Sequence, residues 1–233
     1  MTTVHTLASG SSGNALLLSC GESYILLDAG ISCRRITAAL RELGLELGSL
    51  TAILITHTHA DHISGLQTLL KRCAAPVFTT ERAARELSWR LPGAETRLDA
   101  AGGAVGVLTD TGYVTDEAAD ILEGVDLAVL EANHDIETLR SGPYPYYLKQ
   151  RILGAQGHLS NEDAARFAAV LAQSGTSEII LAHLSRENNT PAMAQTAGER
   201  ALSAAGVSPL LSVAPRDCLG PAHTVSRRSV CRR

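Results

Sequence analysis

The side chains best suited to metal chemistry gather in residues 56–65, which read THTHADHISG. At the end of an extended strand, His57 and His59 point to the same side because side chains alternate, and Asp61 and His62 follow at the next turn. Imidazole and carboxylate groups bind Zn²⁺, Mn²⁺ or Fe²⁺, and two neighbouring pairs suit two ions that share one water molecule. A histidine-rich surface loop is the alternative, but four ligand-type side chains at a strand-to-helix junction favour a metal site.

Three more residues of the same chemical kind follow apolar runs elsewhere in the chain. Asp28 is placed to orient a metal-bound histidine, although a turn aspartate before Gly30 is an equally good interpretation in isolation. Asp110 is the candidate for a carboxylate that bridges two cations, and His183 is a further candidate ligand. Because α/β folds place their sites at the ends of sheet strands, these positions together predict one metal centre.

A glycine- and serine-rich segment, residues 9–14, lies between the first two predicted strands. Its glycines allow positive φ, so the amides and the side chains of Ser11, Ser12 and Asn14 are candidates to bind a phosphate. The alternative is a flexible hairpin loop. The segment is not a P-loop, since it lacks the lysine and the helix that follows one.

Two further histidines precede or follow predicted elements. His158 comes just before a helix and is a candidate general acid or oxyanion stabiliser, with a helix-cap histidine as the alternative. Ser160 is expected to cap that helix, whose first turn carries Glu162 and Asp163. His134 is a weaker second candidate.

Hydrophobic patterning predicts the elements that must position these residues. The predicted strands are residues 4–8, 15–19, 24–28, 52–56, 105–109, 127–131, 179–182 and 209–213. The predicted helices are residues 34–43, 61–72, 81–90, 116–122, 161–173 and 191–204. The first three strands follow one another through short turns and should pair antiparallel, whereas later strands alternate with helices. We therefore expect an α/β protein with two mixed sheets covered by helices.

Composition narrows the class of protein. The chain has 233 residues and a net charge of −4, so its body is not a basic nucleic-acid binder of the usual kind. The segment after Asp217 carries four arginines and no acidic residue, and is either a phosphate-contacting arm or a frayed terminus. Five cysteines without a CxxC spacing favour reduced thiols and a cytoplasmic protein. We find neither a signal peptide nor an apolar run approaching the ~20 residues of a membrane span.

Together these residues resemble the metallo-β-lactamase superfamily. Residues 57–62 match its HxHxDH signature, and Asp28, Asp110 and His183 match its other acidic and histidine motifs. Within the superfamily the chain is similar to the YycJ (WalJ) group. The segments that match this group are residues 7–14 (LASGSSGN), 109–114 (TDTGYV), 130–135 (LEANHD), 142–146 (GPYPY), 157–161 (GHLSN) and 182–189 (AHLSRENN).

The resemblance implies an αββα sandwich of two mixed sheets, formed as a single domain by residues 1–216 and followed by a basic, flexible tail at residues 217–233. It implies two divalent ions, Zn²⁺, Mn²⁺ or Fe²⁺, at an edge between the sheets. The implied ligands are His57, His59 and Asp110 for one ion, and Asp61, His62, Asp110 and His183 for the other.

The resemblance also implies phosphodiester hydrolysis, with nucleic acid as substrate and double-stranded DNA exonuclease activity proposed for the group. In that reaction Asp61 orients the attacking water and His158 stabilises or protonates the leaving oxygen. No membrane partner is expected, and the sequence leaves the oligomeric state open.

One departure from the superfamily pattern is serious. Members carry a further metal histidine between HxHxDH and the bridging aspartate, but here no histidine lies between His62 and His134. We expect the segment that holds it to be missing near residue 96, which would leave the first metal short of one ligand and the first sheet incomplete. Natural degeneration and an error in the sequence both remain explanations.

Two rival functions follow from these features. A thioester or lactam hydrolase on the same scaffold would use Tyr144, Tyr146 and Tyr147 as a wall for a small molecule. A catalytically impaired remnant that binds one metal or a nucleic acid would follow from the absent histidine.

Overall fold

The computed structural model describes residues 2–88 and 104–225 of the chain. Contacts divide these residues into two compact units, each built around its own sheet. The first unit contains residues 2–88 and 217–224, and the second contains residues 104–216 and residue 225. No helix of the described ranges is long and apolar enough to cross a membrane.

The first unit holds a six-stranded sheet in the order β10-β1-β2-β3-β4-β5. The strands β1, β2 and β3 pair antiparallel, as predicted, whereas β3, β4 and β5 are parallel because helices connect them. Gly21 forms the turn between β2 and β3 with a φ of 61°, a conformation that glycine adopts without strain. The strands are β1 (Thr2–Ala8), β2 (Ala15–Cys20), β3 (Ser23–Leu27), β4 (Ala52–Ile55), β5 (Val77–Thr79) and β10 (Ala222–Val225).

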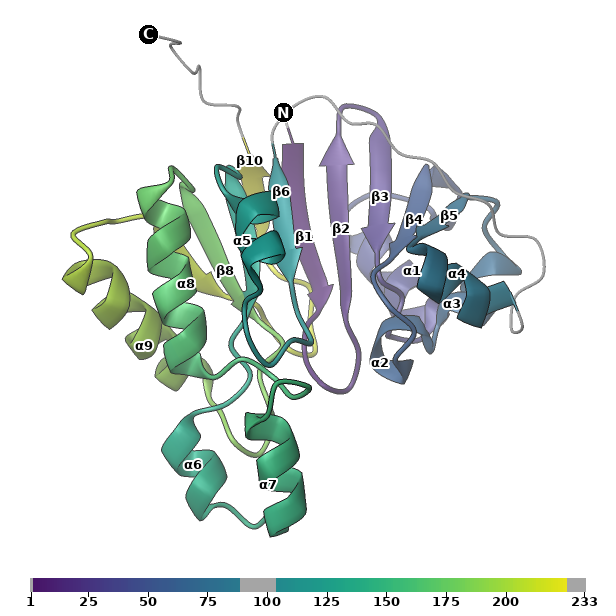
Figure 1. The fold of residues 1–233 in the computed structure, drawn as a ribbon. Coiled ribbons are helices and arrows are strands. Elements are labelled where there is room, and N and C mark those ends of the chain that lie inside the picture. The colour runs from purple at the N-terminus through teal and green to yellow at the C-terminus, as the bar shows by residue number, and fades with distance from the viewer. Residues whose placement is uncertain (1, 89–103, 226–233) are drawn as a thin grey trace, which may run out of the picture. The chain divides into compact units, whose positions relative to one another are not determined.

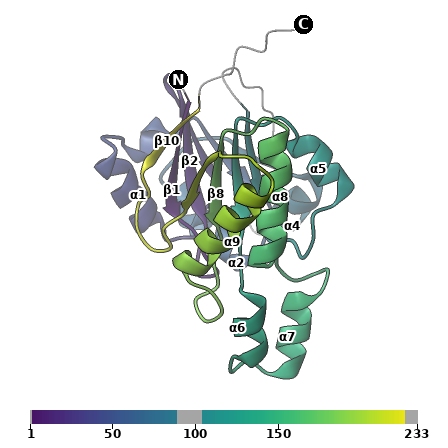
Figure 2. The same cartoon turned by 90° about the vertical axis from the view of Figure 1, so that its left-hand side faces the viewer.

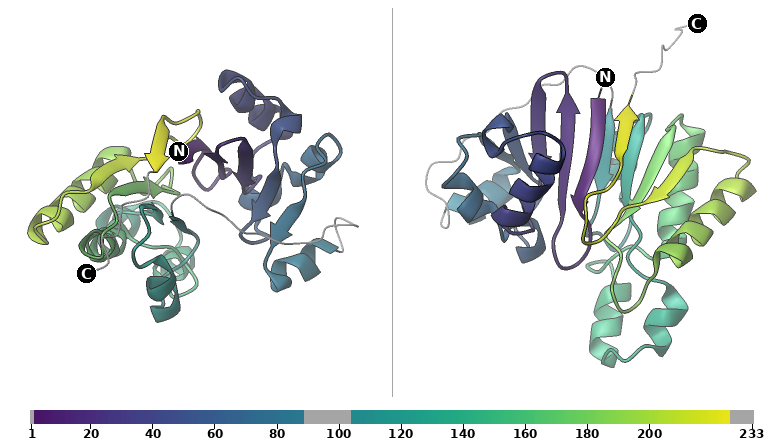
Figure 3. Two further views of the ribbon diagram at one scale, coloured as in Figure 1. Left: turned by 90° about the horizontal axis from the view of Figure 1, so that it is seen from above. Right: turned by 180° about the vertical axis from the view of Figure 1, so that it is seen from behind.

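Helices cover one face of this sheet. Leu26, Ile53 and Val77 are neighbours in register and bury their side chains against that layer, where Ile36 and Leu69 also lie. Each buried side chain of this size contributes about 2 kcal/mol. Figure 3 shows the helices beside the strands of this unit. They are α1 (Cys33–Glu42), the short 3₁₀ helix η1 (Leu47–Ser49), α2 (Ala60–Ile63), α3 (Leu66–Leu70) and α4 (Glu81–Ser88).

The predicted helix over residues 61–72 is two short helices, α2 and α3. The chain breaks at Gly65, whose amide donates to the Ala29 carbonyl at 2.8 Å. A side chain at this position would approach the Ile31 carbonyl to 2.0 Å, so only glycine fits. The break fixes α2, which carries Asp61 and His62, against the end of β3.

The second unit holds a four-stranded sheet in the order β6-β7-β8-β9. All its pairings are parallel, so the expectation of a mixed sheet is wrong for this unit. The reason is that every crossover contains a helix, which returns the chain in the same direction. The strands are β6 (Val105–Leu108), β7 (Leu127–Glu131), β8 (Glu178–Ala182) and β9 (Leu210–Val213), and the helices are α5 (Asp116–Leu122), α6 (Ile136–Ser141), α7 (Tyr146–Leu153), α8 (Asn161–Gln173) and α9 (Pro191–Ala204).

The helix α8 begins where the sequence predicts. The Ser160 hydroxyl accepts from the Asp163 amide at 3.1 Å and satisfies an N–H group that the helix leaves unpaired. Ala164, Phe167 and Leu171 recur at helical spacing and are buried in the core of this unit. Figure 2 shows α8 and α9 side by side in front of β8. This packing fixes the start of α8, directly after His158.

Five described elements escaped prediction: β5, β10, α6, α7 and the 3₁₀ helix η1. The two strands have three and four residues, too few for a clear alternating pattern. Residues 217–233 were predicted to be a tail, and Ala222–Val225 of this segment form β10, while residues 226–233 lie outside the described residues. The expected deletion near residue 96 also falls outside them, within residues 89–103. The cysteines of the described ranges form no disulfide.

Candidate metal centre

Three predicted site residues share an uncommon backbone conformation. Asp28, Asp110 and His183 have φ values of 59°, 59° and 57°, and they are the non-glycine residues with positive φ in the described ranges. Each stands at or just beyond the end of a strand, β3, β6 or β8. This conformation costs about 1–3 kcal/mol for a residue with a side chain, and such strain clusters at functional sites. The positive φ values therefore occur at the same three strand-end residues that the sequence predicts for the metal site.

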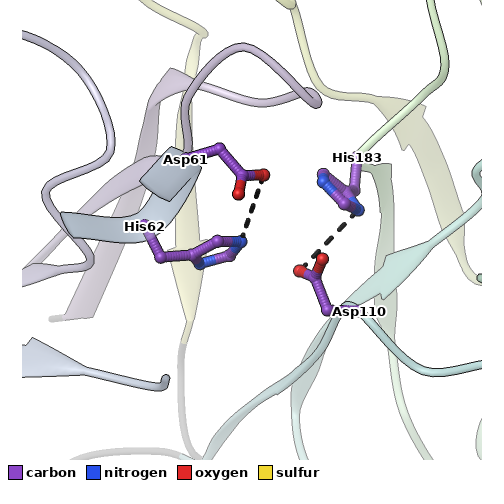
Figure 4. A group of neighbouring side chains, drawn as sticks. All are labelled: Asp61, His62, Asp110 and His183. Carbon is purple, nitrogen blue, oxygen red and sulfur yellow. Dashed lines mark ion pairs between the residues drawn. The ribbon is translucent and has the colours of Figure 1, made fainter. Parts of the chain in front are cut away.

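In the first unit, His62 is held by a buried carboxylate. Its Nδ1 lies 2.7 Å from Oδ2 of Asp28, and both side chains are buried. Because an ionised carboxylate only accepts, Nδ1 carries the proton and Nε2 carries the lone pair. Nε2 lies 3.6 Å from Oδ2 of Asp61, as Figure 4 shows. It also lies 3.0 Å from Nδ2 of Asn14. This is how proteins orient a metal-binding imidazole.

Thr56 supports the same carboxylate, and sequence reasoning missed it. Its amide donates to Oδ1 of Asp28 at 2.9 Å, and its hydroxyl donates to Oδ2 at 2.8 Å. His57 and His59 follow directly, with Nε2 of His57 2.9 Å from Nδ1 of His59. A cavity of about 620 Å³ opens beside His59, with Gln67 in its wall. The chain after β4 therefore presents two imidazoles, of which that of His59 lines open space.

The Ser-Gly loop is tied to the ligands through Asn14. This side chain is buried, and its Nδ2 donates to Oδ2 of Asp61 at 3.2 Å while its Oδ1 accepts from the Gly10 amide at 2.9 Å. Ser11 and Ser12 are exposed at the tip of the loop. The loop therefore both positions Asp61 and presents hydroxyl groups to solvent.

In the second unit, one buried glutamate holds two histidines. Oε1 of Glu131 lies 2.7 Å from Nδ1 of His158 and 2.7 Å from Nδ1 of His183. Oε2 accepts from the amides of Thr111 at 3.0 Å and Leu159 at 3.3 Å. Sequence reasoning missed Glu131 as a site residue, although an acidic residue that ends the otherwise apolar strand β7 was a usable signal.

The charge of Glu131 is stabilised by these donors. Burial on its own raises the pKa of this carboxyl, but the hydrogen bonds from His158 and His183 outweigh burial and leave the pKa below its ordinary value. Glu131 is therefore an anion at neutral pH, which keeps the proton of His183 on Nδ1 and leaves the lone pair on Nε2.

Asp110 lies beside both histidines. Its Oδ2 is 3.8 Å from Nδ1 of His183, and its Oδ1 is 4.0 Å from Nδ1 of His158. Figure 4 shows the carboxylate of Asp110 turned toward the His183 ring. The second unit thus brings together a carboxylate, a buried imidazole and a half-exposed imidazole at the carboxyl ends of β6, β7 and β8.

A set of buried asparagines links the three segments that carry Glu131, His158 and His183, which are the ends of β7 and β8 and the start of α8. Nδ2 of Asn133 donates to the His183 carbonyl at 2.9 Å. Asn161 and Asn189 exchange side-chain hydrogen bonds of 2.8 and 3.0 Å, and Asn189 also donates to the Ala132 carbonyl at 2.8 Å. Because these bonds link the ends of β7 and β8 to the start of α8, they hold the strained backbone at His183 in place.

His134, the weaker candidate, lies in this same region but points away from solvent. Its ring is buried, and among the described residues neither ring nitrogen has a hydrogen-bond partner. Burial, followed by the nearby charge of His158, lowers its pKa to about 4. His134 is therefore neutral at physiological pH and acts as a packing residue.

The donor set of each unit fits a divalent cation. His62 and His183 each keep Nδ1 on a buried carboxylate, so each offers Nε2 as a ligand atom. Imidazole and carboxylate ligands suit Zn²⁺ and related ions. The first unit gathers Asp28, His57, His59, Asp61 and His62, and the second unit gathers Asp110, Glu131, His158 and His183.

Comparisons with known proteins agree with this chemistry. A family model described as the metallo-beta-lactamase superfamily matches residues 8–135. An exodeoxyribonuclease WalJ of Streptococcus pneumoniae is 37% identical over 224 residues, which covers 81% of this chain and 83% of the relative. An exodeoxyribonuclease YycJ of Bacillus anthracis is 33% identical over 234 residues, which covers 86% of this chain and 89% of the relative.

Solved structures give the same fold. The metallo-beta-lactamase fold protein YhfI from Bacillus subtilis matches with a TM-score of 0.67 and 14% identity, over 94% of this chain and 98% of that protein. At this identity the likeness concerns the fold alone, and it confirms the predicted fold class.

Proposed function

Because the chain belongs to the metallo-beta-lactamase superfamily, we propose that it is a metal-dependent phosphodiesterase that degrades DNA from its ends. The observation that carries the proposal is the pair of buried carboxylates, Asp28 and Glu131, that fix the tautomers of His62 and His183. Two curated relatives that match most of the chain are named exodeoxyribonucleases, and their name supports DNA as the substrate.

We propose that the chain binds two divalent ions. Asp110 would be the ligand common to both ions, and the metal would be Zn²⁺ or Mn²⁺, with Fe²⁺ as a third choice. When bound, such ions polarise phosphoryl oxygens and lower the pKa of a water molecule. The ligands we propose are His57 and His59 for one ion, Asp61, His62 and His183 for the other, and Asp110 for both.

The remaining groups act on the substrate and its protons. In the proposal, the carboxylate of Asp61 accepts a hydrogen bond from the attacking water and so orients it toward phosphorus. His158 protonates the leaving oxygen, and Glu131 at 2.7 Å from its Nδ1 stabilises the protonated ring. Ser11 and Ser12 bind the phosphate of a flanking nucleotide. A single domain, a cytoplasmic location and reduced thiols are part of the same proposal.

The alignments support a shortened chain. The alignment with the Streptococcus pneumoniae relative is 224 positions long, but it covers 81% of the 233 residues of this chain, which is only about 189 residues. The difference, about 35 positions, consists of positions at which the relative has no counterpart in this chain. We propose that this gap lies near residue 96 and includes the further metal histidine. His57 and His59 then lack their third nitrogen ligand, and the ion that they hold is bound more weakly than its neighbour.

The proposal is tested with two small substrates and one pair of variants. With Mn²⁺, the purified chain should hydrolyse bis-p-nitrophenyl phosphate, and His62→Ala should abolish turnover. His223→Ala is the matched control, because His223 is a buried histidine of the same unit on β10 and is not a proposed ligand. Faster turnover of a thioester than of the diester, or diester turnover that survives His62→Ala, would contradict the proposal. A metal content of two equivalents per chain would speak against a remnant, whereas one equivalent or none would favour it.

A further inference from the structure

The hairpin formed by α6 and α7 presents two large aromatic side chains to solvent. Tyr146 is 77% exposed and Tyr147 is 74% exposed, and α7 buries none of its residues. Figures 1 and 2 show the hairpin extending beyond the carboxyl ends of the strands of the second unit. Aromatic rings of this size are costly to leave in water, so neighbouring exposed tyrosines on a projecting helix mark a binding surface.

The hairpin is also basic, unlike the chain as a whole. Residues 136–157 contain one acidic residue, Glu137, against Arg140, Lys149 and Arg151, whereas the whole chain has a net charge of −4. Glu137 pairs with Arg140 at 3.0 Å, which leaves the excess positive charge on α7. Nζ of Lys149 donates to the Arg140 and Gly142 carbonyls at 2.7 Å each, so it also fixes the loop between the helices.

The end of α7 is bonded directly to the segment that carries His158. The His158 amide donates to the Ile152 carbonyl at 3.1 Å, and the Gly157 amide donates to the Gly154 carbonyl at 2.8 Å. A Cβ atom on Gly112 would approach the Gly154 carbonyl to 2.2 Å, so the segment after Asp110 also packs against the end of this helix. The carboxyl end of α7 is therefore anchored beside the residues that we propose for catalysis, and Tyr146 and Tyr147 lie at its other end, about 10 Å along the helix.

We propose that Tyr146 and Tyr147 form a stacking platform for unpaired bases of the strand whose end is cut. This inference rests on the proposed function and names how the substrate is held. Stacking on aromatic rings is tolerant of sequence, which suits an enzyme that removes nucleotides in succession. The positive charge of α7 is complementary to the phosphates of the same strand.

The test is binding of a fluorescently labelled single-stranded oligodeoxythymidine to the full chain in the presence of EDTA, measured by anisotropy. The double variant Tyr146→Ala, Tyr147→Ala should bind about tenfold more weakly, within the range seen when a stacking ring is removed. The double variant Tyr146→Phe, Tyr147→Phe keeps both rings and should bind within twofold of the parent. Ile121→Ala is the matched control, because Ile121 is 77% exposed on α5 of the same unit.

Unchanged affinity in the alanine variant would overturn the platform, as would equal loss in the alanine and phenylalanine variants. A change in self-association of the alanine variant without a change in oligonucleotide binding would assign the tyrosines to a second copy of the chain, and would also overturn it. Because binding in EDTA does not depend on hydrolysis, this measurement can refute the stacking platform without refuting the proposed function. Absence of hydrolysis would likewise leave the binding result intact.

Discussion

Replacement of Glu131 by glutamine tests the link between the buried carboxylate and the metal ligands. The carboxylate accepts hydrogen bonds from the Nδ1 groups of His158 and His183 and from the amides of Thr111 and Leu159. A carboxamide has one oxygen and one NH₂ group, so at least one pair of these donors would face another donor. Glu131→Gln therefore leaves buried donors without an acceptor rather than only weakening their hydrogen bonds.

Two magnitudes follow from this geometry. Leaving a buried hydrogen-bond donor without its acceptor costs about 1–3 kcal/mol of the free energy of unfolding. Losing the group that orients a ligating histidine reduces metal affinity about 10- to 100-fold. The pKa of Glu131 is lowered in the folded chain, so its contribution is present above the unfolded value and is lost as the pH falls through the folded value. The stability difference between parent and variant should therefore shrink in acid.

The assays are urea unfolding in EDTA and calorimetric titration with Mn²⁺. Glu178→Gln is the matched control, because Glu178 is a second buried glutamate of the same sheet, at the opposite end of β8 from His183. The control should lose stability without losing metal affinity. Metal affinity of Glu131→Gln within twofold of the parent would refute the role that we assign to Glu131.

Two further predictions concern packing near the proposed ligands of each unit. The pKa of His134 is about 4 in the folded chain and 6.5 in the unfolded chain, so between these values the unfolded chain binds more protons, and about 3 kcal/mol of the free energy of unfolding is lost as the pH falls from 6.5 to 4. The variant His134→Leu has no group to titrate here and should not show this loss. Parallel curves of the free energy of urea unfolding against pH for parent and variant would contradict the prediction. Gly30→Ala places a Cβ atom 1.5 Å from the Asp61 carbonyl, so it should lower the free energy of unfolding by about 3 kcal/mol or more and should also weaken metal binding. Gly48→Ala is the control, because its Cβ atom would have no atom within 4 Å, and it should change little in the same unfolding and titration assays.

The strand ends that carry the site could be predicted because each ligand-type residue follows an apolar run. Asp28, Asp110 and His183 all stand where the sequence places them, although their positive φ values leave no mark in the sequence. The antiparallel start of the first sheet was also predictable, since short turns permit no other pairing.

Other parts of the site depend on contacts between distant residues. Glu131 reads as the last residue of a buried strand, and only the fold brings His158 and His183 to its carboxylate. The exchange of hydrogen bonds between Asn161 and Asn189 likewise requires α8 and the end of β8 to be neighbours. The hairpin of α6 and α7 was missed because its tyrosines and prolines show no helical apolar stripe.

The central claim is tested most directly by comparing linear and covalently closed circular duplex DNA, both incubated with the purified chain and Mn²⁺. We predict that nucleotides are released from the ends of the linear DNA, that the circular DNA stays intact, and that EDTA stops the release. Linear DNA that stays intact with Mn²⁺, Zn²⁺ and Fe²⁺, under conditions where metal is bound, would contradict the account.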